Sequence, residues 1–402
     1  MKITFFVLVP IIMIISSCSS QTKRLSKNEF NNNYKFNSEI SQILSTDSIN
    51  PNYQSAAISF SAKGDYKNAL LNWDMSPMFK PKIKTYPKDK IDSINNRFKV
   101  ILAKDYILEQ SNKNKIIIIN EFHHNATHRV LTESLLQNLF DNGYKNLCLE
   151  ALNNGSKEDT LLNKRKYPIQ SSGYYIKNPQ FGNLVRTALK IGYKLFPYET
   201  TQKIGGEPRE VDQANNIKKI IDDRPNEKFL IQCGSGHALE GDVRFFGGLA
   251  LAERIHKLTG INPLTVDQVY YSEKSKAEYN SPIFKAIDVK KPSILLDKNN
   301  FPFSYKNGAS WIDIVVFHPN TEYINNRPNW LINDQSKLVQ IELDNIDLNF
   351  PVMIMAFNSN EDFKHAIPVD ILEVEHKKNA SFLALQKGKF TIVIVNQTGE
   401  AM

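Results

Sequence analysis

The sequence predicts an α/β fold in which a mostly parallel sheet is flanked by helices. Short, uninterrupted apolar runs recur at residues 115–120, 145–149, 194–197 and 228–232, with helix-like patterns between them. Uninterrupted runs of this length are typical of strands buried on both faces, and their alternation with helices is typical of βαβ units. Because the carboxyl ends of parallel strands lie at one edge of a sheet, we expect residues that follow these runs to meet there.

Helix boundaries support this alternation. Gly143 and Gly192 each follow a helix-like pattern at the position where glycine is favoured, and Pro208 suits the first turn of another helix. The expected helices are 127–142, 183–191, 208–223 and 242–258, and a further strand is expected at 263–269.

The two flanks of this core differ from it and from each other. Residues 36–112 are expected to be helical, because 57–74 resembles one helix pair of a tetratricopeptide repeat and 88–110 has helix-spaced apolar positions. A single pair cannot stack into a solenoid, so we interpret this region as a packing appendage. Residues 276–402 show short alternating runs and are expected to form antiparallel β structure, either as a small domain or as an extension of the main sheet. The core domain is then 113–275.

The first 18 residues have the pattern of a bacterial lipoprotein signal peptide. Lys2 precedes an apolar run at 3–15 that is too short to span a bilayer comfortably, and Ile15-Ser16-Ser17-Cys18 resembles a lipobox. We expect lipidation at Cys18, a flexible tether over residues 19–35, and a place in the bacterial cell envelope, anchored to a membrane outside the cytoplasm. The alternative is an ordinary secretory signal with a chance cysteine.

Charge and cysteine content narrow the class of protein. The net charge is +8, with basic residues scattered along the chain, which indicates at most a general preference for anionic surfaces or substrates. No nucleic-acid-binding fingerprint is present, so we expect no nucleic-acid partner. Cys148 and Cys233 form neither a disulfide framework nor a C-x-x-C motif. We expect Cys148 to be a small buried hydrophobe.

Residues able to move protons or bind metal follow four successive strands. They are Glu121 with His123, Glu150, Glu199 and His237. Glu121 and His123 are two positions apart, so their side chains project to the same side if the strand geometry continues. Taken singly, each acid fits a helix cap or a solvated carboxylate equally well. Their common position predicts a shared cleft at the sheet's carboxyl edge.

A second group lies on the helix expected to begin at Pro208. Arg209, Asp212, Gln213 and Asn216 share one face of this helix, and a solvent-exposed face is the alternative interpretation. If the helix start points into the cleft, Arg209 could hold an anionic group or a developing oxyanion.

These residues together resemble the erythromycin esterase/ChaN/TIKI superfamily. The resemblance rests on N-E-F-H at 120–123, Glu150, R-E-V-D-Q-A-N-N-I at 209–217 and C-G-S-G-H at 233–237, and it spans residues 115–268. Asn120 stands where the family has a leading glycine, so the backbone before Glu121 is expected to differ. The family includes esterases, metal-dependent proteases and haem-binding lipoproteins, so the resemblance implies a shared site more than a shared reaction.

The resemblance implies that Glu121, His123, Glu150 and His237 form the core of the site. In a metal-free scheme His123 activates water, Glu121 or Glu150 orients its ring, and His237 or Arg209 stabilises the oxyanion. In a metal scheme the same four residues, Glu121, His123, Glu150 and His237, bind a divalent ion, and such a ligand set suits Zn, Mn or Fe.

Several neighbouring residues are weaker candidates. We expect His124 at the surface, and His128 as a possible lining residue of the cleft. Cys233 with His237 suggests a cysteine hydrolase, but a structural cysteine is the favoured interpretation because nothing establishes a base within reach. Ser235 lies in G-S-G rather than in a nucleophile elbow, and Tyr174 and Tyr175 are candidate pocket walls or haem ligands.

The sequence thus predicts a lipid-anchored hydrolase of an ester or amide bond in a small molecule or peptide. The alternative is a haem- or metal-binding uptake lipoprotein without catalysis. A third possibility, a scaffold that has lost the reaction, is supported only by Asn120 in place of glycine.

Overall fold

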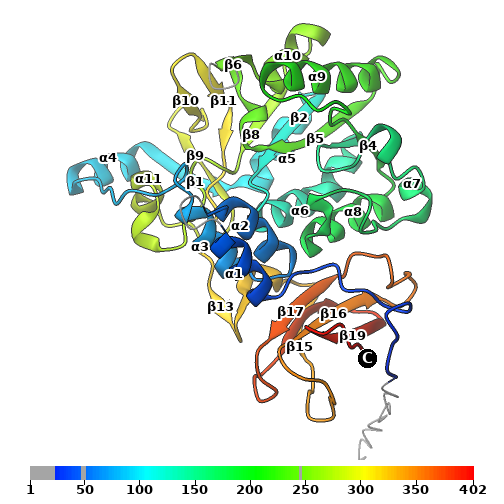
Figure 1. Cartoon of the computed structure of the whole chain (residues 1–402). Helices are drawn as coiled ribbons and strands as arrows, with labels where there is room; N and C mark the ends of the chain where they lie inside the picture. Colours follow the sequence, from blue (N-terminus) through cyan, green and yellow to red (C-terminus); the bar gives the residue numbers. More distant parts are fainter. Residues whose placement is uncertain (1–22, 47–50, 244–246) are drawn as a thin grey trace, which may run out of the picture.

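A six-stranded parallel sheet forms the centre of the molecule. The computed structural model describes residues 23–46, 51–243 and 247–402, so Cys18 and the expected signal peptide lie outside the described residues. The strand order in the sheet is β12-β8-β2-β5-β3-β4, with every pairing parallel. The predicted fold class is therefore confirmed (Figure 1). The strands are β2 (Ile116–Glu121), β3 (Tyr144–Leu149), β4 (Lys194–Pro197), β5 (Lys228–Gly234), β8 (Leu264–Asp267) and β12 (Ile314–Val315).

The isoleucine run of β2 explains why this strand lies inside the sheet. All six residues of β2 are buried, and its isoleucines alternate between the two faces. Ile117 and Ile119 belong to the cluster with α5, α6 and α8, whereas Ile116 and Ile118 belong to the cluster with α9 and α10. The helices are α5 (Ala103–Ser111), α6 (Thr127–Asp141), α8 (Pro179–Ile191), α9 (Gly206–Asp222) and α10 (Leu251–Thr259). Two helical layers thus cover the sheet (Figure 1).

The predicted glycine stops are present. Gly143 and Gly192 follow α6 and α8 with φ of +96° and +119°, the left-handed region that only glycine adopts readily. One long helix was wrongly predicted, because residues 242–258 contain β6 (Glu240–Val243) and β7 (Gly248–Leu249) before α10 begins. β6 pairs with β11 (Ser310–Ile312), a partner from far along the chain that local periodicity cannot indicate.

The N-terminal region is helical, with one exception. It contains α1 (Asn37–Thr46), α2 (Tyr53–Ala62), α3 (Tyr66–Met75) and α4 (Lys88–Arg97). The α2–α3 turn needs Gly64, whose φ is +79° and where a Cβ would lie 2.4 Å from the carbonyl oxygen of Ile371. The helix-spaced apolar pattern at 88–110 includes β1 (Phe98–Leu102), which pairs antiparallel with β9 (Ser293–Asp297). That pairing overrides the helical pattern there.

The C-terminal strands occupy both of the expected places, but the strand that joins the main sheet pairs with it parallel and not antiparallel as expected. β12 joins the main sheet, and β9, β10 (Tyr305–Asn307) and β11 pack beside it. The last strands form a separate antiparallel unit, in which β17 and β19 flank β16 and β15 pairs with β18 (Figure 1). They are β15 (Ser336–Gln340), β16 (Val352–Asn358), β17 (Asp370–Val374), β18 (Phe382–Gln386) and β19 (Phe390–Asn396), after the hairpin β13 (Tyr323–Ile324) and β14 (Arg327–Pro328).

Short helices connect these elements, and among the described residues no helix is long and apolar enough to cross a membrane. The connections that matter for the site are η2 (Tyr175–Lys177), before α8, and η3 (Ser235–Ala238), directly after β5. The others are η1 (Gly155–Lys157), α7 (Leu162–Arg165), η5 (Ala277–Tyr279), α11 (Pro282–Ala286) and η6 (Asn329–Leu331).

Candidate functional site

The predicted residues converge at the carboxyl edge of the parallel sheet. Glu121 ends β2 and pairs in register with Gly234 at the end of β5, which places the turn carrying His237 beside the turn carrying His123. Glu150 follows β3, and its backbone N–H donates to the carbonyl oxygen of Gln232 on β5 at 3.2 Å. The site contains two groups of side chains, one around Glu121 and one around Arg209.

The Glu121 group consists of Glu121, His123, Arg129 and Gln232. Arg129 donates from Nε and Nη2 to the two carboxylate oxygens of Glu121 at 2.7 and 2.9 Å, and Gln232 donates to Oε2 at 2.9 Å. Glu121 and Arg129 are both buried. Burial raises the pKa of Glu121, but Arg129 and His123 outweigh burial and hold that pKa below its ordinary value. The Glu121 carboxylate is therefore charged and held in a fixed position next to the His123 ring.

Glu121 sets the orientation of the His123 ring. Nδ1 of His123 lies 2.9 Å from Oε1 of Glu121, and an ionised carboxylate can only accept, so Nδ1 carries the proton. In the neutral ring the lone pair then lies on Nε2. A Cβ on Gly234 would lie 3.2 Å from this Nε2 and 3.2 Å from Oε2 of Glu150, so glycine leaves room between the two groups. Tyr175 stacks on the ring with 3.6 Å between centroids.

The Arg209 group consists of Arg209, Glu150, Glu199, Glu210 and His237. Nη2 of Arg209 donates to Oε1 of Glu150 at 2.5 Å and to Glu199, whose Oε1 also accepts from Nε at 3.0 Å. Oε2 of Glu150 accepts from the backbone N–H of Gly234. Burial raises the pKa of Glu150, but His237 and Arg209 overcome burial and hold it well below its ordinary value.

His237 lies between two carboxylates. Nδ1 lies 2.6 Å from Oε1 of Glu210, and Nε2 lies 3.4 Å from Oε1 of Glu150. Burial lowers the pKa of His237, but Glu150 and Glu210 outweigh it and raise that pKa to about 10. Glu210 is itself fixed, because its Oε2 accepts from the backbone N–H of Leu251 at 2.8 Å. The raised pKa favours the imidazolium form of His237 at neutral pH, and its Nε2 lies 3.0 Å from Nη1 of Arg209.

Solvent reaches only part of this arrangement. The side chains of His123, Arg209 and Glu199 are 21%, 27% and 27% exposed, whereas those of Glu121, Glu150 and His237 are buried. Each of the three buried side chains lies within 4 Å of a group of opposite charge. A substrate would thus meet the His123 ring and the Arg209 guanidinium first.

Two histidines lie elsewhere than expected. His124 is buried, stacked on Trp73 with 4.1 Å between ring centroids, so its predicted surface position is wrong. His128 is fully buried and does not line the cleft, because its Nδ1 accepts from the backbone N–H of Phe122 at 3.0 Å. Burial lowers the pKa of both rings well below the ordinary value. His128 instead fixes the backbone between Glu121 and His123.

Asn120 has a role that glycine could not supply. Its Nδ2 donates to Oδ1 of Asp267 and to the carbonyl oxygen of Ser235, each at 3.0 Å, and its Oδ1 accepts from the backbone N–H of Gln268 at 2.7 Å. The side chain therefore ties β2 to β8 and to the η3 turn that carries His237. Asn120 therefore helps to hold the strand end that carries Glu121 beside the turn that carries His237.

The remaining candidates are structural or peripheral. Cys233 is buried, its Sγ lies 3.8 Å from the carbonyl oxygen of Ile119, and burial raises its pKa well above the ordinary value. A thiolate nucleophile there is unfavourable. Cys148 is fully buried, as expected. Tyr174 is 58% exposed and meets Tyr175 edge-to-face, which suits a pocket wall.

The four predicted metal ligands do not fit a metal centre. Among the described residues no group of three or more His, Cys, Asp or Glu side chains is placed to share an ion. Every carboxylate oxygen of Glu121 and Glu150 already accepts from a guanidinium, an amide or a backbone N–H. A bound cation would have to displace these donors, so these residues do not fit the metal scheme.

The sequence did not predict the roles of four residues of the site. They are Arg129, Glu210, Gln232 and His128, the last of which holds the backbone N–H of Phe122. Gln232 offered a signal, since a polar side chain inside the apolar run 228–232 must find a buried partner. Glu210, next to Arg209, offered none, because the sequence cannot indicate that it turns toward His237. Of the predicted helix face, Gln213 donates to Oε1 of Glu199 at 3.0 Å and Asn216 donates to the carbonyl oxygen of Tyr198 at 3.0 Å. That face is not simply solvent-exposed.

No protein-family model matches the sequence, and no curated protein matches it. Solved structures with some similarity include the type III effector HopBA1, at 14% identity and a TM-score of 0.32, covering 43% of this chain and 86% of that one. The toxin effector domain RRSP from Vibrio vulnificus CMCP6 is 14% identical with a TM-score of 0.31, covering 58% of this chain and 46% of that one. The Pasteurella multocida toxin, described as having a thiol-protease-like catalytic triad in its C-terminal region, is 11% identical with a TM-score of 0.29, covering 60% and 32%. This chain thus spans less than half of the last two proteins, and these likenesses carry no argument about its activity.

Proposed function

We propose that this protein hydrolyses an ester or amide bond with a water molecule activated by His123. The observation that carries the proposal is the Glu121–His123 pair, because a carboxylate held ionised by Arg129 fixes the proton on Nδ1 and leaves Nε2 as the base. The ring is partly exposed, as the approach of a water molecule requires. Tyr175, stacked on one face, limits the ring's rotation.

In the proposed reaction the water oxygen attacks the carbonyl carbon while Nε2 of His123 takes a water proton. The carbonyl oxygen becomes an oxyanion beside Arg209. Nε and Nη2 of this guanidinium are engaged by Glu199 and Glu150, so Nη1 is the nitrogen that remains to donate to the substrate. Collapse of the intermediate breaks the bond to the leaving alcohol or amine, which receives the proton from His123.

His237 contributes positive charge rather than a lone pair. The raised pKa of His237 favours protons on both of its nitrogens. Nη1 of Arg209 lies 3.0 Å from Nε2 of His237 and carries two hydrogens, so one hydrogen remains for the oxyanion whichever group donates in that contact. Glu150 is the shared partner that holds these two cations together. In this scheme Glu150 and Glu210 are positioning residues.

The protein's place in the cell is also a proposal. We propose that Cys18 is lipidated and holds the enzyme at a membrane of the bacterial envelope, outside the cytoplasm, and that the chain is a divergent relative of the erythromycin esterase/ChaN/TIKI superfamily. Fatty-acid labelling of the wild type and of Cys18→Ser in a bacterial host tests the anchor. Label that persists in Cys18→Ser would contradict it.

The activity is tested by screening ester and peptide substrates with the wild type, His123→Ala and Glu121→Ala. We expect His123→Ala to lower kcat/KM by about 10³-fold, in the range for loss of a general base, with an unchanged circular dichroism spectrum. Asn215→Ala, an exposed position on α9, serves as the control. Full activity in His123→Ala would remove the proposal. A Soret band on adding haem, without turnover, would favour the uptake alternative.

A further inference from the structure

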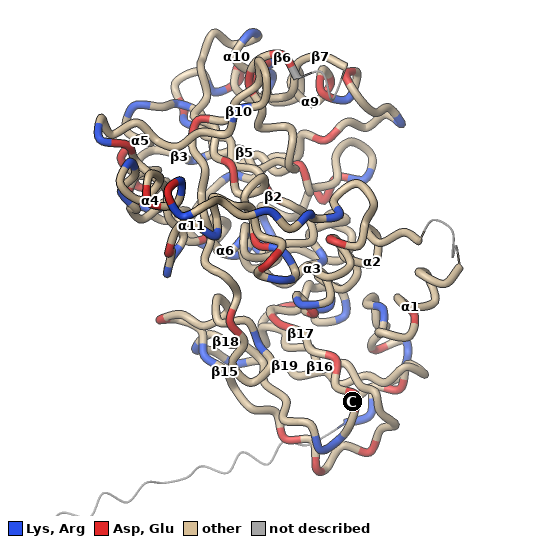
Figure 2. The backbone as a smooth tube through the Cα atoms, turned by 90° about the vertical axis from the view of Figure 1, so that its left-hand side faces the viewer, with Lys and Arg blue, Asp and Glu red and all other residues tan. Residues whose placement is uncertain are grey.

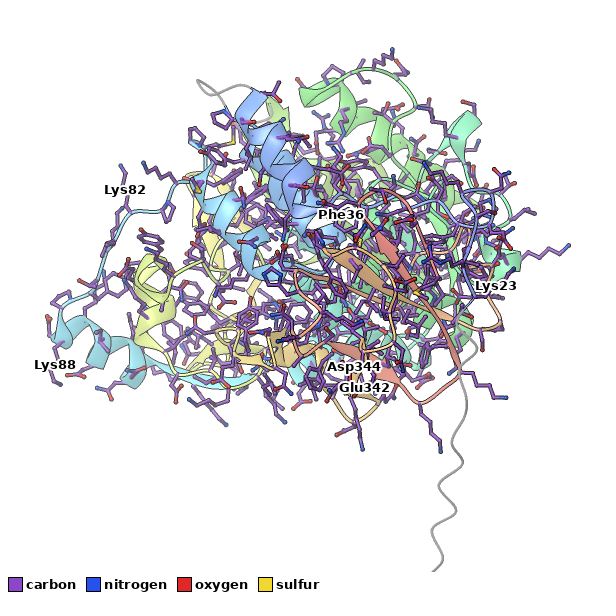
Figure 3. The ribbon with its side chains drawn as sticks, turned by 60° about the horizontal axis from the view of Figure 1, so that its bottom comes forward. Lys23, Phe36, Lys82, Lys88, Glu342 and Asp344 are labelled. Atoms are coloured by element: carbon purple, nitrogen blue, oxygen red, sulfur yellow. The ribbon has the colours of Figure 1, made fainter. Side chains whose placement is uncertain are left out.

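The connection between α3 and α4 begins with a turn at residues 76–79 and continues as a mostly exposed segment without helix or strand. Residues 76–87 contain no helix or strand, and Pro77, Pro81 and Pro87 favour an extended backbone. We call residues 75–90 the lysine strap. Figure 3 shows Lys82 and Lys88 pointing away from the body of the protein at one side of the view, with Lys23 on the other side.

The lysine strap concentrates positive charge. It carries five lysines and one aspartate, a net +4 against +8 for the whole chain, so the basic residues are less evenly scattered than the sequence composition indicated. The lysines are Lys80, Lys82, Lys84, Lys88 and Lys90. Within the described part of the chain, the first three of these lysines, at positions 80, 82 and 84, are exposed and form no ion pair. Figure 2 shows the face that carries α4, with basic positions along the strap.

Large apolar side chains lie among these charges. Met75, Met78 and Ile83 are 47%, 67% and 63% exposed. Single exposed apolar residues are ordinary on a protein surface, but three within nine residues, bracketing Lys80 and Lys82, form a mixed basic and apolar strip.

The lysine strap is attached to the core close to the candidate site. Phe79 stacks on Trp73 with 4.5 Å between centroids and meets Phe122 edge-to-face at 5.7 Å. Phe122 lies between Glu121 and His123 in the sequence. Phe79 of the lysine strap therefore contacts Phe122, the residue that directly precedes the proposed base, His123.

We propose that the lysine strap docks on the surface of a bilayer containing anionic phospholipids. Lysines next to such a surface gain favourable interaction with the headgroups, and side chains such as Met78 and Ile83 can enter the boundary between headgroups and acyl chains. A nucleic acid would use the lysines but would leave these apolar side chains in water, so the lipid surface is the better match. The proposal depends on the envelope location only for the supply of a bilayer.

Vesicle sedimentation tests the proposal with a chain that begins at Ser19, which retains every described helix and strand and has no lipid. We expect binding to vesicles with 30 mol% phosphatidylglycerol and none to pure phosphatidylcholine. Lys80→Glu/Lys82→Glu/Lys84→Glu should lower the partition coefficient by about 100-fold or more, since each lysine contributes roughly a factor of five. Met78→Ser/Ile83→Ser should lower it by about 10-fold.

A matched control separates the strap from net charge. Lys378→Glu/Lys387→Glu/Lys389→Glu makes the same charge change at exposed positions of the C-terminal β unit and should leave binding within about twofold of the wild type. Equal losses in both triple variants, or no binding to the anionic vesicles, would overturn the proposal. So would duplex DNA binding as tight as vesicle binding, if Met78→Ser/Ile83→Ser left both unchanged. Hydrolysis of a soluble substrate without vesicles is a separate readout, so failure here is distinguishable from failure of the proposed function.

Discussion

The two groups of the candidate site contain the same residue types but surround their histidines with different numbers of carboxylates. In the Glu121 group one histidine faces one carboxylate, and a buried arginine already compensates that carboxylate. In the Arg209 group one histidine lies between two carboxylates, Glu150 and Glu210. The excess of carboxylates over arginines in the second group explains why the pKa of His237 is raised to about 10, which favours its charged form.

The two arginines of the site differ in their exposure to solvent. Arg129 is fully buried, whereas the side chain of Arg209 is 27% exposed. The first arginine is thus part of the fold, and the second can meet a substrate. The comparison predicts that equivalent substitutions in the two groups fail in different ways.

The largest effect on stability is expected from Arg129→Met. It leaves the Glu121 carboxylate buried without its cation, which costs about 3–5 kcal/mol of unfolding free energy. Urea denaturation measures this loss. The double variant Arg129→Met/Glu121→Gln is the control and should recover much of it. A loss below about 1 kcal/mol in Arg129→Met would mean that the Glu121 group is not a compensated buried pair.

Arg209→Met is expected to act on turnover instead. Removing a donor to the oxyanion lowers kcat by about 10²–10³-fold, while partial exposure keeps the stability loss below that of Arg129→Met. Steady-state kinetics and urea denaturation of the same preparation check both parts. A change in KM alone would assign Arg209 to substrate binding rather than to the transition state.

Glu210→Gln tests the charge on His237. The pKa of His237 is raised to about 10 in the folded protein, above its ordinary value of 6.5, so the stability from this group is full below about pH 6.5 and is lost as pH rises through 10. Removing one carboxylate moves that loss, and the alkaline limb of kcat/KM, to lower pH, with about a 10-fold drop in rate at pH 8. Glu207→Gln, exposed on the same helix, is the matched control. An unmoved alkaline limb would contradict the assigned charge.

The smallest effect is expected from Asn120→Gly, which restores the residue found in the resembling family. The substitution removes the donors to Asp267 and to the η3 turn, and we expect a loss of about 1–2 kcal/mol in urea denaturation. It also loosens the alignment of the two groups, so kcat should fall by about 10-fold with little change in KM. Unchanged or raised activity would support the glycine-type geometry instead.

The sequence was sufficient for the sheet and for the convergence of its strand ends. The isoleucines of β2 indicate burial on both faces, and parallel strands bring Glu121, Glu150 and His237 to one edge whatever the details of the loops. The glycine stops after α6 and α8 are equally local signals, because a positive φ there depends on the residue itself.

The features that the sequence did not predict depend on contacts between residues far apart in the chain. β1 follows a helix-like pattern and is a strand only because β9 pairs with it. His124 looks like a surface residue until Trp73, about fifty positions earlier, covers its ring. Arg129 lies outside the quoted motifs, and Glu210 lies inside the 209–217 run without any sign of its partner, so both roles come from the carboxylate and the imidazole that these residues contact.

The central claim is that His123 offers a lone pair at Nε2 while His237 keeps both ring protons. Nitrogen-15 NMR of the histidine rings at pH 8.5, assigned with His123→Gln and His237→Gln, tests it most directly. The account predicts that His123 carries its proton on Nδ1, with Nε2 unprotonated, and that His237 is protonated on both nitrogens because its pKa is about 10. A neutral His237 at this pH, or a His123 with its proton on Nε2, would contradict the account.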